Sequence, residues 1–360
     1  MSFTKIAVLG LGNVGRLVAR LLHEFGFSVI AFDALPSVAG DQPFERRVLD
    51  VSSSGDLAQA LGSSKAVISC LPYHLNAAVA AAAHAGGLHY FDLTEDVSVT
   101  KTVRELAETS DRVMAPQCGL APGYIGIVGA HLAQPFESLR SIKLRVGALP
   151  QNPTGLLGYA FNWSPEGVVN EYLNDCEVIE EGEHKWVSPM EWIETLYVQG
   201  TKLEVFTTSG GLGTMCETFM GRVENLDYKT MRYPGHVALM NFFFHELLMR
   251  DHRDIAGKLL TNAKPPVDDD VVYVHVSAEG QIEGKLRRQE FVRAYYPKAI
   301  AGKRRTAIAW TTSVSACAVI ELVQSGKLAE RGFIHQENIR LPDLLSTRSG
   351  KLFGKDLSEL

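Results

Sequence analysis

Cysteine is scarce in this sequence, and its spacing excludes two common kinds of structural cross-link. The 360 residues contain five cysteines, an odd number, with no Cys-X-X-Cys pair. A disulfide framework needs an even set, and a structural zinc site needs closely spaced ligand pairs, so we expect neither. Reduced thiols of this kind fit the cytoplasm, and no metal site is predicted. The cysteines are Cys70, Cys118, Cys176, Cys216 and Cys317.

Long apolar runs and an amino-terminal targeting segment are also missing. The most apolar stretches, residues 77–83 and 237–249, end before the roughly 18 residues that a membrane span requires. A strand pattern already begins at Lys5, so we expect no signal peptide. These absences predict a soluble, cytoplasmic protein with no membrane partner.

Positive charge is not in excess. Lys and Arg number 35 against 41 Asp and Glu, a net charge of −6, and the longest basic run is residues 303–305. Nucleic-acid binding needs clustered positive charge, so we expect no nucleic-acid partner. Interleaved charges favour a small metabolite bound in a pocket instead. With 46% apolar residues, a chain of this length predicts two domains with sizeable cores.

The first 120 residues alternate short apolar runs with helical patterns, as parallel strands joined by crossover helices do. We expect strands at residues 5–9, 28–32, 46–48, 66–70, 89–92 and 112–115. Helices are expected at residues 14–25, 55–61, 75–85 and 99–108. The predicted fold class is therefore α/β, with a Rossmann doubly wound parallel sheet in this region.

Beyond Pro122 the pattern changes to longer alternating segments, which indicate an α+β substrate domain with a mixed sheet. An amphipathic helix is predicted over residues 306–326, and an irregular loop over residues 262–266, where two prolines cannot donate to a strand ladder. The alternating segments lie at residues 139–147, 158–163, 202–207 and 271–278.

A glycine-rich turn follows the first strand. Gly10, Gly12 and Gly15 stand between an apolar strand pattern and a helical pattern, the context of a dinucleotide-binding loop. Gly10 permits the tight turn, Gly12 lets the backbone approach a pyrophosphate, and Gly15 lets helix and strand pack closely. The helix N-terminus, at Asn13 and Val14, supplies N–H groups to the phosphates.

Asp33 ends the second strand, 23 residues after Gly10, close to the roughly 20 expected for the carboxylate that binds the adenosine ribose. A carboxylate there repels a 2′-phosphate, and Ala34, Leu35 and Pro36 offer no arginine to offset it. We therefore expect NAD as the cofactor in preference to NADP. The alternative is a related domain that has lost its dinucleotide or binds another nucleotide.

Ligands of doubly wound sheets bind beyond the carboxyl ends of the strands, which singles out the residues after the fourth strand. Leu71 and Pro72 are expected to contact the cofactor, and Pro72 to direct Tyr73 and His74 towards the crevice. Both are candidate catalytic residues because they face the crevice, and a histidine can in addition exchange a proton near neutral pH. In the alternative interpretation His74 or Asn76 caps the next helix and Tyr73 packs on it.

The fifth and sixth strands lead into loops at the same edge. Asp92 and Glu95 come from an acidic cluster and are candidates to bind a substrate ammonium or to accept its proton. Acidic loops are also commonly solvated or cap helices, so that alternative stays open. Tyr124, at the end of the loop over residues 117–124, is a candidate substrate contact.

The second domain contributes a candidate carboxylate site. The strand pattern at residues 202–207 continues into Thr208, Ser209 and Gly210, whose hydroxyl and N–H groups suit a carboxylate. Arg232 stands beside a Pro-Gly turn and is a candidate bidentate clamp for the same group. A surface ion pair is the alternative role for this arginine.

Together with the glycine-rich turn, four motifs resemble the saccharopine dehydrogenase family: residues 71–73, 118–123, 206–211 and 228–236. The chain looks most like the lysine 6-dehydrogenases of that family. The resemblance implies an NAD(P)-dependent oxidoreductase that acts on a C–N bond of a small amino-acid or amine substrate, and usually a homodimer. It also implies an NAD-binding domain and a domain for substrate binding and dimerisation, formed respectively by residues 1–123 with 306–345 and by residues 124–305.

Some positions depart from the family pattern. Saccharopine reductases that resemble this chain carry an Asp where Ala121 stands and a Cys within residues 146–150, and neither is present here. The lysine dehydrogenases look similar at those places, but they typically show glycines where residues 94–96 are Thr-Glu-Asp. The first difference disfavours saccharopine as substrate, and the second leaves the exact amine open.

The predicted function is oxidation of an amine on an amino acid, in which a hydride passes to the nicotinamide and the imine hydrolyses or cyclises. Two alternatives remain. One is a reductase that joins an amine to a carbonyl compound, as in saccharopine or carboxynorspermidine formation. The other is an NAD-binding sensor without turnover.

Overall fold

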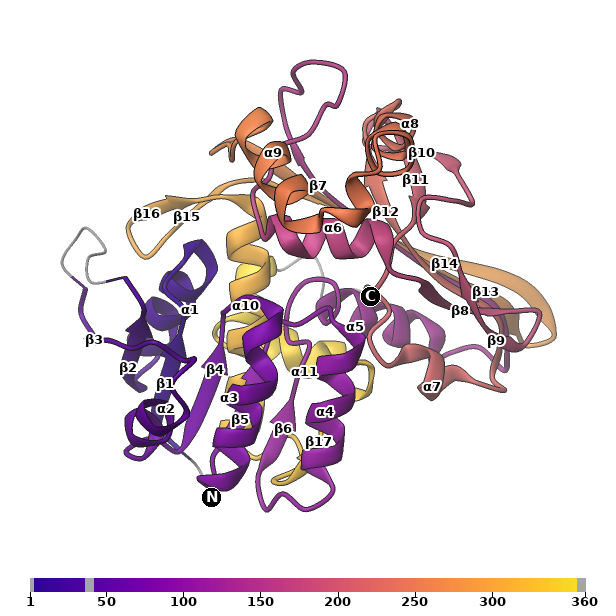
Figure 1. Ribbon diagram of the computed structural model, residues 1–360. Coiled ribbons are helices and arrows are strands. Elements are labelled where there is room, and N and C mark those ends of the chain that lie inside the picture. The colour runs from indigo at the N-terminus through magenta and orange to yellow at the C-terminus, as the bar shows by residue number, and fades with distance from the viewer. Residues whose placement is uncertain (1–2, 36–41, 355–360) are drawn as a thin grey trace. The chain divides into compact units, whose positions relative to one another are not determined.

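The chain forms two compact units in a computed structural model that describes residues 3–35 and 42–354 (Figure 1). Unit 1 consists of residues 1–124 and 309–360, and unit 2 consists of residues 125–308. Each unit is built on its own large β-sheet. Pro36, one of the three residues after Asp33 that offer no arginine to a 2′-phosphate, lies outside the described residues.

Unit 1 contains a seven-stranded parallel sheet in the order β17-β6-β5-β4-β1-β2-β3. The apolar runs predict its first six strands to within one residue at each end, and this prediction is confirmed. The seventh, β17, was not predicted, because two residues are too few to show a periodicity. The strands are β1 (Lys5–Leu9), β2 (Ser28–Asp33), β3 (Glu45–Val48), β4 (Ala66–Ser69), β5 (His89–Asp92), β6 (Val113–Ala115) and β17 (Gly332–Phe333).

Four helices connect these strands, and the sequence predicts each end to within two residues. They are α1 (Asn13–Glu24), α2 (Ser54–Leu61), α3 (Tyr73–Ala85) and α4 (Val97–Ala107). Helices α2, α3 and α4 lie side by side on one face of the sheet (Figure 1). The strand order reverses between β1 and β4, so the carboxyl ends of these two strands form the point at which a doubly wound fold binds its ligand.

Helix α10 (Ala307–Gln324) corrects the prediction of an amphipathic helix at 306–326. The helix is buried on nearly every side, and 83% of its 18 residues lie inside the protein. Such burial is typical of a core helix rather than a membrane span. The polar residues that suggested an outer face are serines and threonines, which are small enough to be buried. For example, Ser313 Oγ donates to the carbonyl of Ala309 at 2.7 Å and to that of Val14, in α1, at 3.1 Å.

Unit 2 contains a mixed sheet, as predicted. The main strand order is β10-β11-β12-β7-β13-β14, with β8 paired to β12 and β9 to β8. Strand β12 runs parallel to β7, and the other pairs are antiparallel. The strands are β7 (Ser138–Pro150), β8 (Cys176–Glu180), β9 (Glu183–Val187), β10 (Glu194–Val198), β11 (Thr201–Thr207), β12 (Val223–Arg232), β13 (Asp270–Ile282) and β14 (Lys285–Tyr295), and a separate hairpin is formed by β15 (Lys298–Ile300) and β16 (Lys303–Arg305).

Two local predictions for unit 2 are wrong. Residues 158–163 form no strand, because Gly158 adopts φ +57° and turns the chain out of an extended path. Their alternation instead places Tyr159 and Phe161 in the apolar core of the unit. The loop expected at residues 262–266 begins only at Lys264, because helix α9 (Arg253–Ala263) continues into it.

The remaining helices are short. Helix α5 starts at Tyr124, the last residue of the first segment of unit 1. The α-helices are α5 (Tyr124–Ala133), α6 (Pro165–Leu173), α7 (Met215–Phe219), α8 (His236–Asn241) and α11 (Leu341–Ser346), with a π-helix at Phe242–Glu246 and 3-10 turns at Met249–Asp251, Gln336–Asn338 and Gly350–Phe353.

Candidate active site

The glycine-rich loop joins β1 to α1, and the space available for a side chain differs at each of its three glycines. Gly10 adopts φ +84°, and a Cβ there would meet the carbonyl oxygen of Cys70 at 2.8 Å. A Cβ on Gly15 would lie 1.8 Å from the carbonyl oxygen of Gly10. A Cβ on Gly12 would meet nothing within 4 Å. Gly10 and Gly15 are therefore required by the fold itself, whereas Gly12 leaves open space beside the backbone, as a bound pyrophosphate requires.

Helix α1 begins beside this open space. Gly12 is its N-cap and has no side chain, so no side-chain cap satisfies the first N–H groups at Asn13 and Val14. Uncapped N–H groups and the positive end of the helix dipole together favour a phosphate. The loop and helix therefore fit a dinucleotide.

Asp33 is held at the end of β2 by the backbone. Its Oδ2 accepts a hydrogen bond from Leu11 N at 2.6 Å, and its Oδ1 accepts one from Leu35 N at 2.9 Å. The first bond links the carboxylate directly to the glycine-rich loop. An adenosine ribose bound at this loop would therefore lie within reach of Asp33.

The residues after β4 do not support the capping alternative. Helix α3 begins after Pro72 without a side-chain cap. Asn76 is buried and accepts a hydrogen bond from Ser69 Oγ at 2.6 Å, so it joins helix to strand. The rings of Tyr73 and His74 meet edge to face at 5.8 Å, with Tyr73 half-buried and His74 exposed. Leu71, like Tyr73, packs partly against the core of unit 1.

Asp92 is fully buried at the end of β5 and ties that strand to two loops. Its Oδ1 accepts from Thr94 N at 3.0 Å and from Gln117 N at 2.9 Å, while its Oδ2 accepts from Tyr90 Oη at 2.7 Å. Burial raises the pKa of this carboxyl to about 6, although the three hydrogen bonds oppose the shift. These bonds tie Asp92 to both loops at the end of β5.

The other acidic residues of this loop divide into a cap and a candidate base. Asp96 is the N-cap of α4 and accepts from Val99 N at 2.9 Å. Glu95 is half-buried, and no other described residue donates a hydrogen bond to its carboxylate. Burial raises its pKa to about 7, and the neighbouring Asp96 and Asp92 add to the shift. Glu95 is thus suited to exchange a proton near neutral pH.

Tyr124 does not lie in the candidate site. Its side chain is fully buried and stacks on Phe353, with ring centroids 4.2 Å apart and planes 5° apart. The sequence shows that Tyr124 ends a loop, but it does not show that the ring packs against Phe353, which is more than 200 residues further along the chain. Tyr124 therefore contributes packing in unit 1 rather than a surface for substrate.

Arg232 is the most buried cation of unit 2 that lacks a carboxylate partner. Its Nε donates to Tyr172 Oη at 2.7 Å, and its Nη1 donates to Thr230 Oγ1 and to the carbonyl of Met231. The guanidinium also lies over the ring of Tyr159, 4.7 Å from the centroid. Within residues 42–354 and 3–35, Nη2 donates to nothing and no acid forms an ion pair with Arg232. The surface-ion-pair alternative is therefore wrong.

His236 stabilises this arrangement and was not singled out from the sequence. Its Nδ1 lies 2.9 Å from the carbonyl oxygen of Leu157, which only accepts, so Nδ1 carries the proton. Its Nε2, 3.0 Å from Tyr172 Oη, then accepts the phenol proton. Burial and the nearby Arg232 lower the pKa of His236 to about 3, so the ring is neutral. Its burial depends on folding, which a single sequence does not reveal.

The loop after β11 is only partly available to a ligand. Ser209 Oγ donates to the carbonyl of Asp175 at 2.9 Å, so its hydroxyl serves the fold. Thr208 Oγ1 is buried and has no hydrogen-bond partner, which is costly unless a ligand supplies one. Gly210 adopts φ +84° and allows the turn. Of the three predicted residues, Thr208 is the one whose hydroxyl still lacks a hydrogen-bond partner.

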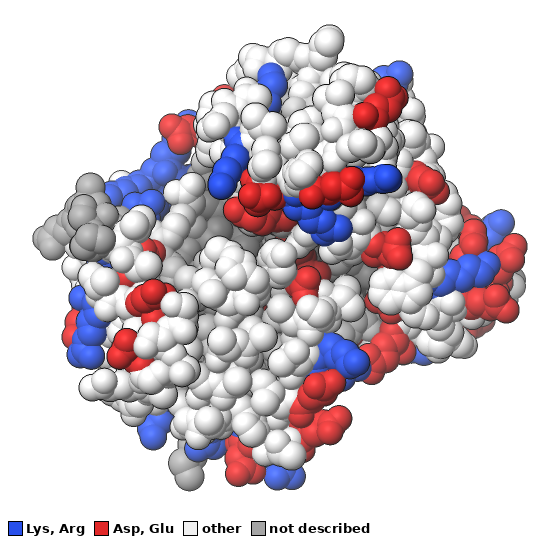
Figure 2. Space-filling model, viewed as in Figure 1, with Lys and Arg blue, Asp and Glu red and all other residues white. Residues whose placement is uncertain are grey.

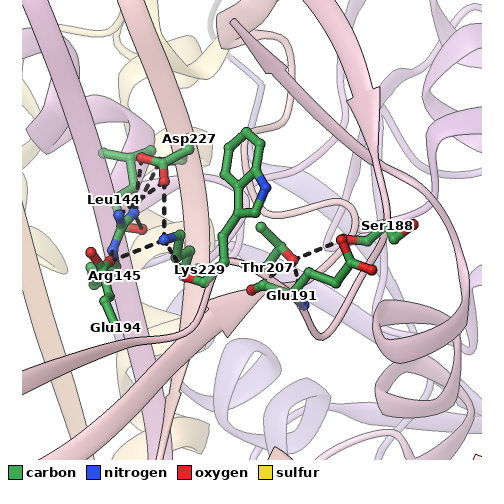
Figure 3. Close-up of polar contacts among 9 residues, drawn as sticks. Leu144, Arg145, Ser188, Glu191, Glu194, Thr207, Asp227 and Lys229 are labelled. Carbon is green, nitrogen blue, oxygen red and sulfur yellow. Dashed lines mark hydrogen bonds and ion pairs between the residues drawn. The ribbon is translucent and has the colours of Figure 1, made fainter. Parts of the chain in front are cut away.

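In a second buried cluster of charged side chains, each cation is paired with carboxylates (Figure 3). Arg145 donates to Glu194 Oε1 at 2.7 Å and to Asp227 Oδ2 at 2.9 Å. Lys229 lies 3.4 Å from Glu194 and 3.8 Å from Asp227, and it donates to the carbonyl of Trp192 at 2.7 Å. Two cations thus share two carboxylates, so this cluster stabilises the sheet and leaves no charge for a ligand.

Lys229 and Arg232 lie on opposite faces of β12, because they are three residues apart and side chains alternate along a strand. The paired cluster therefore occupies one face, and the unpaired arginine occupies the other. On the face that carries Arg232, the buried Glu171 acts on the guanidinium electrostatically but forms no direct ion pair with it.

Two family profiles match the chain in succession. The saccharopine dehydrogenase NADP binding domain matches residues 6–115, and the saccharopine dehydrogenase C-terminal domain matches residues 119–347. The chain belongs to the saccharopine dehydrogenase family. Membership makes it an NAD(P)-dependent oxidoreductase that acts on CH–NH groups, so the resemblance drawn from the sequence is confirmed at the level of the family.

Solved structures with a similar fold include one from the same family. Apo saccharopine dehydrogenase (L-Glu forming) from Saccharomyces cerevisiae is 16% identical, with 94% of each chain covered and a TM-score of 0.72. An engineered D-amino acid dehydrogenase bound to NADP+ is 13% identical, with 98% of each chain covered and a TM-score of 0.52. The C. glutamicum DAP dehydrogenase in complex with DAP is 11% identical, covers 99% of this chain and 100% of its own, and has a TM-score of 0.50. At these identities the likeness concerns the fold.

Among the described residues, no three or more His, Cys, Asp or Glu side chains are grouped to hold a metal ion. Acidic and basic side chains are interspersed on the face seen in Figure 2. The match to the saccharopine dehydrogenase NADP binding domain supports a nicotinamide cofactor.

Proposed function

We propose that this protein oxidises the amine C–N bond of a free amino acid with NAD as hydride acceptor, in the manner of a lysine 6-dehydrogenase. The observation that carries the proposal is Arg232. The guanidinium is buried and forms a direct ion pair with no described carboxylate, although the buried Glu171 acts on it electrostatically, and a planar carboxylate of a ligand matches its geometry. An amino acid is the substrate that supplies both a carboxylate for Arg232 and an oxidisable amine.

Each unit has a proposed role. The first domain, at residues 1–123 and 306–345, holds the dinucleotide through Gly10, Gly12, Gly15 and Asp33. The second, at residues 124–305, holds the amino acid and forms the contacts of a homodimer in the cytoplasm, as the resemblance implies. When bound, the nicotinamide supplies the acceptor for the hydride.

We assign substrate binding to groups whose hydrogen-bonding capacity is not used within the protein. Arg232 Nη2 and Thr208 Oγ1 bind the carboxylate, and Tyr172 with His236 keeps the guanidinium oriented. Glu95 accepts a proton from the substrate ammonium, because its raised pKa lets it gain a proton near pH 7. Tyr73 and His74 border the same strand ends, and we assign them contacts rather than proton transfer.

The preference for NAD rests on Asp33. Its carboxylate, fixed by two backbone N–H groups, is placed to accept hydrogen bonds from the ribose hydroxyls. A 2′-phosphate at the same place meets a negative charge. We therefore propose that NAD binds more tightly than NADP.

The function is tested by mixing the purified protein with NAD and single amino acids at alkaline pH, and by following NADH absorbance. We expect reduction of NAD with lysine or another diamino acid. Reduction only with a secondary amine such as saccharopine, or oxidation of NADH only with an amine and a keto acid together, would instead establish the condensing reductase. No turnover in either direction, with NADH still bound, would establish the sensor.

The pH dependence tests Glu95. As a base it must be deprotonated, so kcat/KM for amine oxidation should rise with pH through about 7, the pKa set by burial. Glu95→Gln should lower kcat by about 100-fold and remove that inflection, since general-base catalysis is worth about 10² to 10⁴ in rate. Kinetics from pH 5 to 9 measure both.

The same substitution has an independent effect on stability. A carboxyl whose pKa is higher in the folded than in the unfolded protein makes unfolding easier as pH rises, here between about 4 and the folded value of about 7. Glu95→Gln should therefore flatten the Tm against pH in that window. Asp96→Asn, which removes a charge that adds to the pKa shift of Glu95, should keep the kinetic inflection but displace it to lower pH. An unchanged inflection in Glu95→Gln would assign the base elsewhere.

A further inference from the structure

The loop that carries Glu95 is held on both sides by hydrogen bonds within unit 1. On the strand side, Thr94 N donates to Asp92 Oδ1 at 3.0 Å, and Thr94 Oγ1 accepts from Asp96 N at 3.1 Å. On the helix side, Thr100 Oγ1 donates to the carbonyl of Asp96 at 3.0 Å. The backbone before and after Glu95 is therefore fixed both to the end of β5 and to the first turn of α4.

Gln117 joins these two sides from a different part of the chain. Its backbone N–H donates to Asp92 Oδ1 at 2.9 Å, and its Nε2 donates to Thr100 Oγ1 at 3.0 Å. The residue follows β6, and only 4% of its surface is exposed. It adopts φ +65°, which is strained for residues other than glycine. The fold thus keeps a glutamine in a strained conformation where its two donors reach both supports of the Glu95 loop.

The Glu95 side chain has little else to hold it in place. Apart from its own backbone N–H, no donor within residues 3–35 and 42–354 contacts its carboxylate. The charged groups that act on it are Asp96 and Asp92, and both are negative. Charge therefore repels an ionised Glu95 from this loop, so its position depends on the hydrogen-bonded backbone around it.

We propose that Gln117 is a positioning residue for amine oxidation: through Asp92 and Thr100 it holds the Glu95 carboxylate where it accepts the proton of the substrate ammonium. This rests on the proposed function, in which Glu95 is the base. Gln117 contacts neither substrate nor cofactor in this assignment, so it contributes geometry alone. A base must lie within hydrogen-bond reach of its proton, and a displacement of about 1 Å can cost about 100-fold in rate.

A positioning role has a kinetic consequence that a purely structural role lacks. Burial is the main cause that raises the pKa of Glu95 to about 7. If the loop is released, the carboxylate gains access to water and this pKa falls, so the inflection in kcat/KM moves to lower pH. A loss of stability alone lowers the amount of folded enzyme equally for every step of the reaction, and the inflection of the folded fraction stays where it is.

The first test is Gln117→Met, which keeps an unbranched side chain of similar length but lacks the amide. We expect kcat for lysine at pH 9 to fall by about 10-fold, because the base is displaced while the carboxylate site and the dinucleotide site are intact. KM and the dissociation constant of NADH should stay within about 2-fold of wild type. The inflection should move down by about one pH unit. Steady-state kinetics from pH 5 to 9 and NADH titration measure these quantities.

Helix α4 supplies a second test with a matched control. Thr100→Val removes the oxygen that accepts from Gln117 and should reproduce the effects of Gln117→Met, whereas Thr100→Ser keeps that oxygen and should restore kcat and the inflection. Thr102 Oγ1 donates to the carbonyl of Ser98 at 3.1 Å, the same kind of bond on the same helix, without a contact to Gln117. Thr102→Val should therefore behave as wild type.

The outcomes separate the role of Gln117 from the proposed function. If Gln117→Met and Thr100→Val keep the wild-type kcat and inflection while Glu95→Gln loses both, Glu95 is the base without help from Gln117, and only the positioning role is overturned. A lower Tm with unchanged kinetics has the same meaning. If Gln117→Met does not fold, the comparison of Thr100→Val with Thr100→Ser decides. If Glu95→Gln keeps the inflection, or wild type oxidises no amine, the proposed base or the proposed function fails, and the positioning role fails with it.

Discussion

Arg232→Ala should lower kcat/KM for the amino-acid substrate by about 100- to 1,000-fold, chiefly through KM, with the dissociation constant of NADH unchanged. The reason is that Nη2 has no partner in the protein, whereas Nε and Nη1 are held by Tyr172, Thr230 and the backbone. Losing a buried charge-assisted contact to a carboxylate costs about 3–4 kcal/mol, which corresponds to that factor. Steady-state kinetics and NADH titration measure the two quantities.

The substrate itself supplies the sharpest control. Cadaverine is lysine without its carboxylate, so wild-type protein should use it about as poorly as Arg232→Ala uses lysine. The variant should not discriminate between lysine and cadaverine, because the group that recognises the difference is absent. Equal loss on both substrates would show that Arg232 is structural.

A second arginine separates recognition from folding. Arg145→Ala removes a buried cation that is fully paired with Glu194 and Asp227, on the opposite face of the sheet. It should lower Tm strongly, since it leaves two carboxylates partly uncompensated. The remaining folded protein should still prefer lysine to cadaverine. Arg232→Lys keeps the charge but not the planar fork, and should recover part of the discrimination.

The sequence predicts the sheet of unit 1 well because local signals agree there. Strand β4 is fully buried and β1 is buried except at its first residue, Lys5, while Gly10 and Gly15 stand where a Cβ would clash. The errors arise where long-range packing decides. Gly158 breaks an alternating segment, and Ser313 and Ser315 of α10 are fully buried although they are polar.

The candidate site was predicted by residue type but not by partner. Arg232 and Thr208 keep hydrogen-bonding groups that no protein group uses, whereas the Ser209 hydroxyl bonds to the backbone and the Tyr124 ring packs on Phe353. Those contacts depend on residues far away in sequence, such as Phe353 for Tyr124, so spacing cannot show them.

Gly12→Ala should weaken NADH binding by at least about 100-fold while leaving the fold intact. Gly12 adopts φ −64°, which alanine also favours, and a Cβ there meets no protein atom within 4 Å. The methyl group fills only the space that a pyrophosphate would occupy, so it displaces the phosphates from the uncapped N–H groups of α1. Losing about two charge-assisted contacts costs about 3 kcal/mol or more.

Two other glycines make this prediction specific. Gly15→Ala should prevent stable folding, because its Cβ would lie 1.8 Å from the carbonyl oxygen of Gly10. Gly26→Ala, at φ +89° with open space around it, should cost about 1 kcal/mol of stability through backbone strain and leave NADH binding as in the wild type. Fluorescence titration and thermal denaturation of the three variants separate binding from folding. If Gly12→Ala binds NADH like wild type, the dinucleotide is held elsewhere, since the steric change would then have met no ligand.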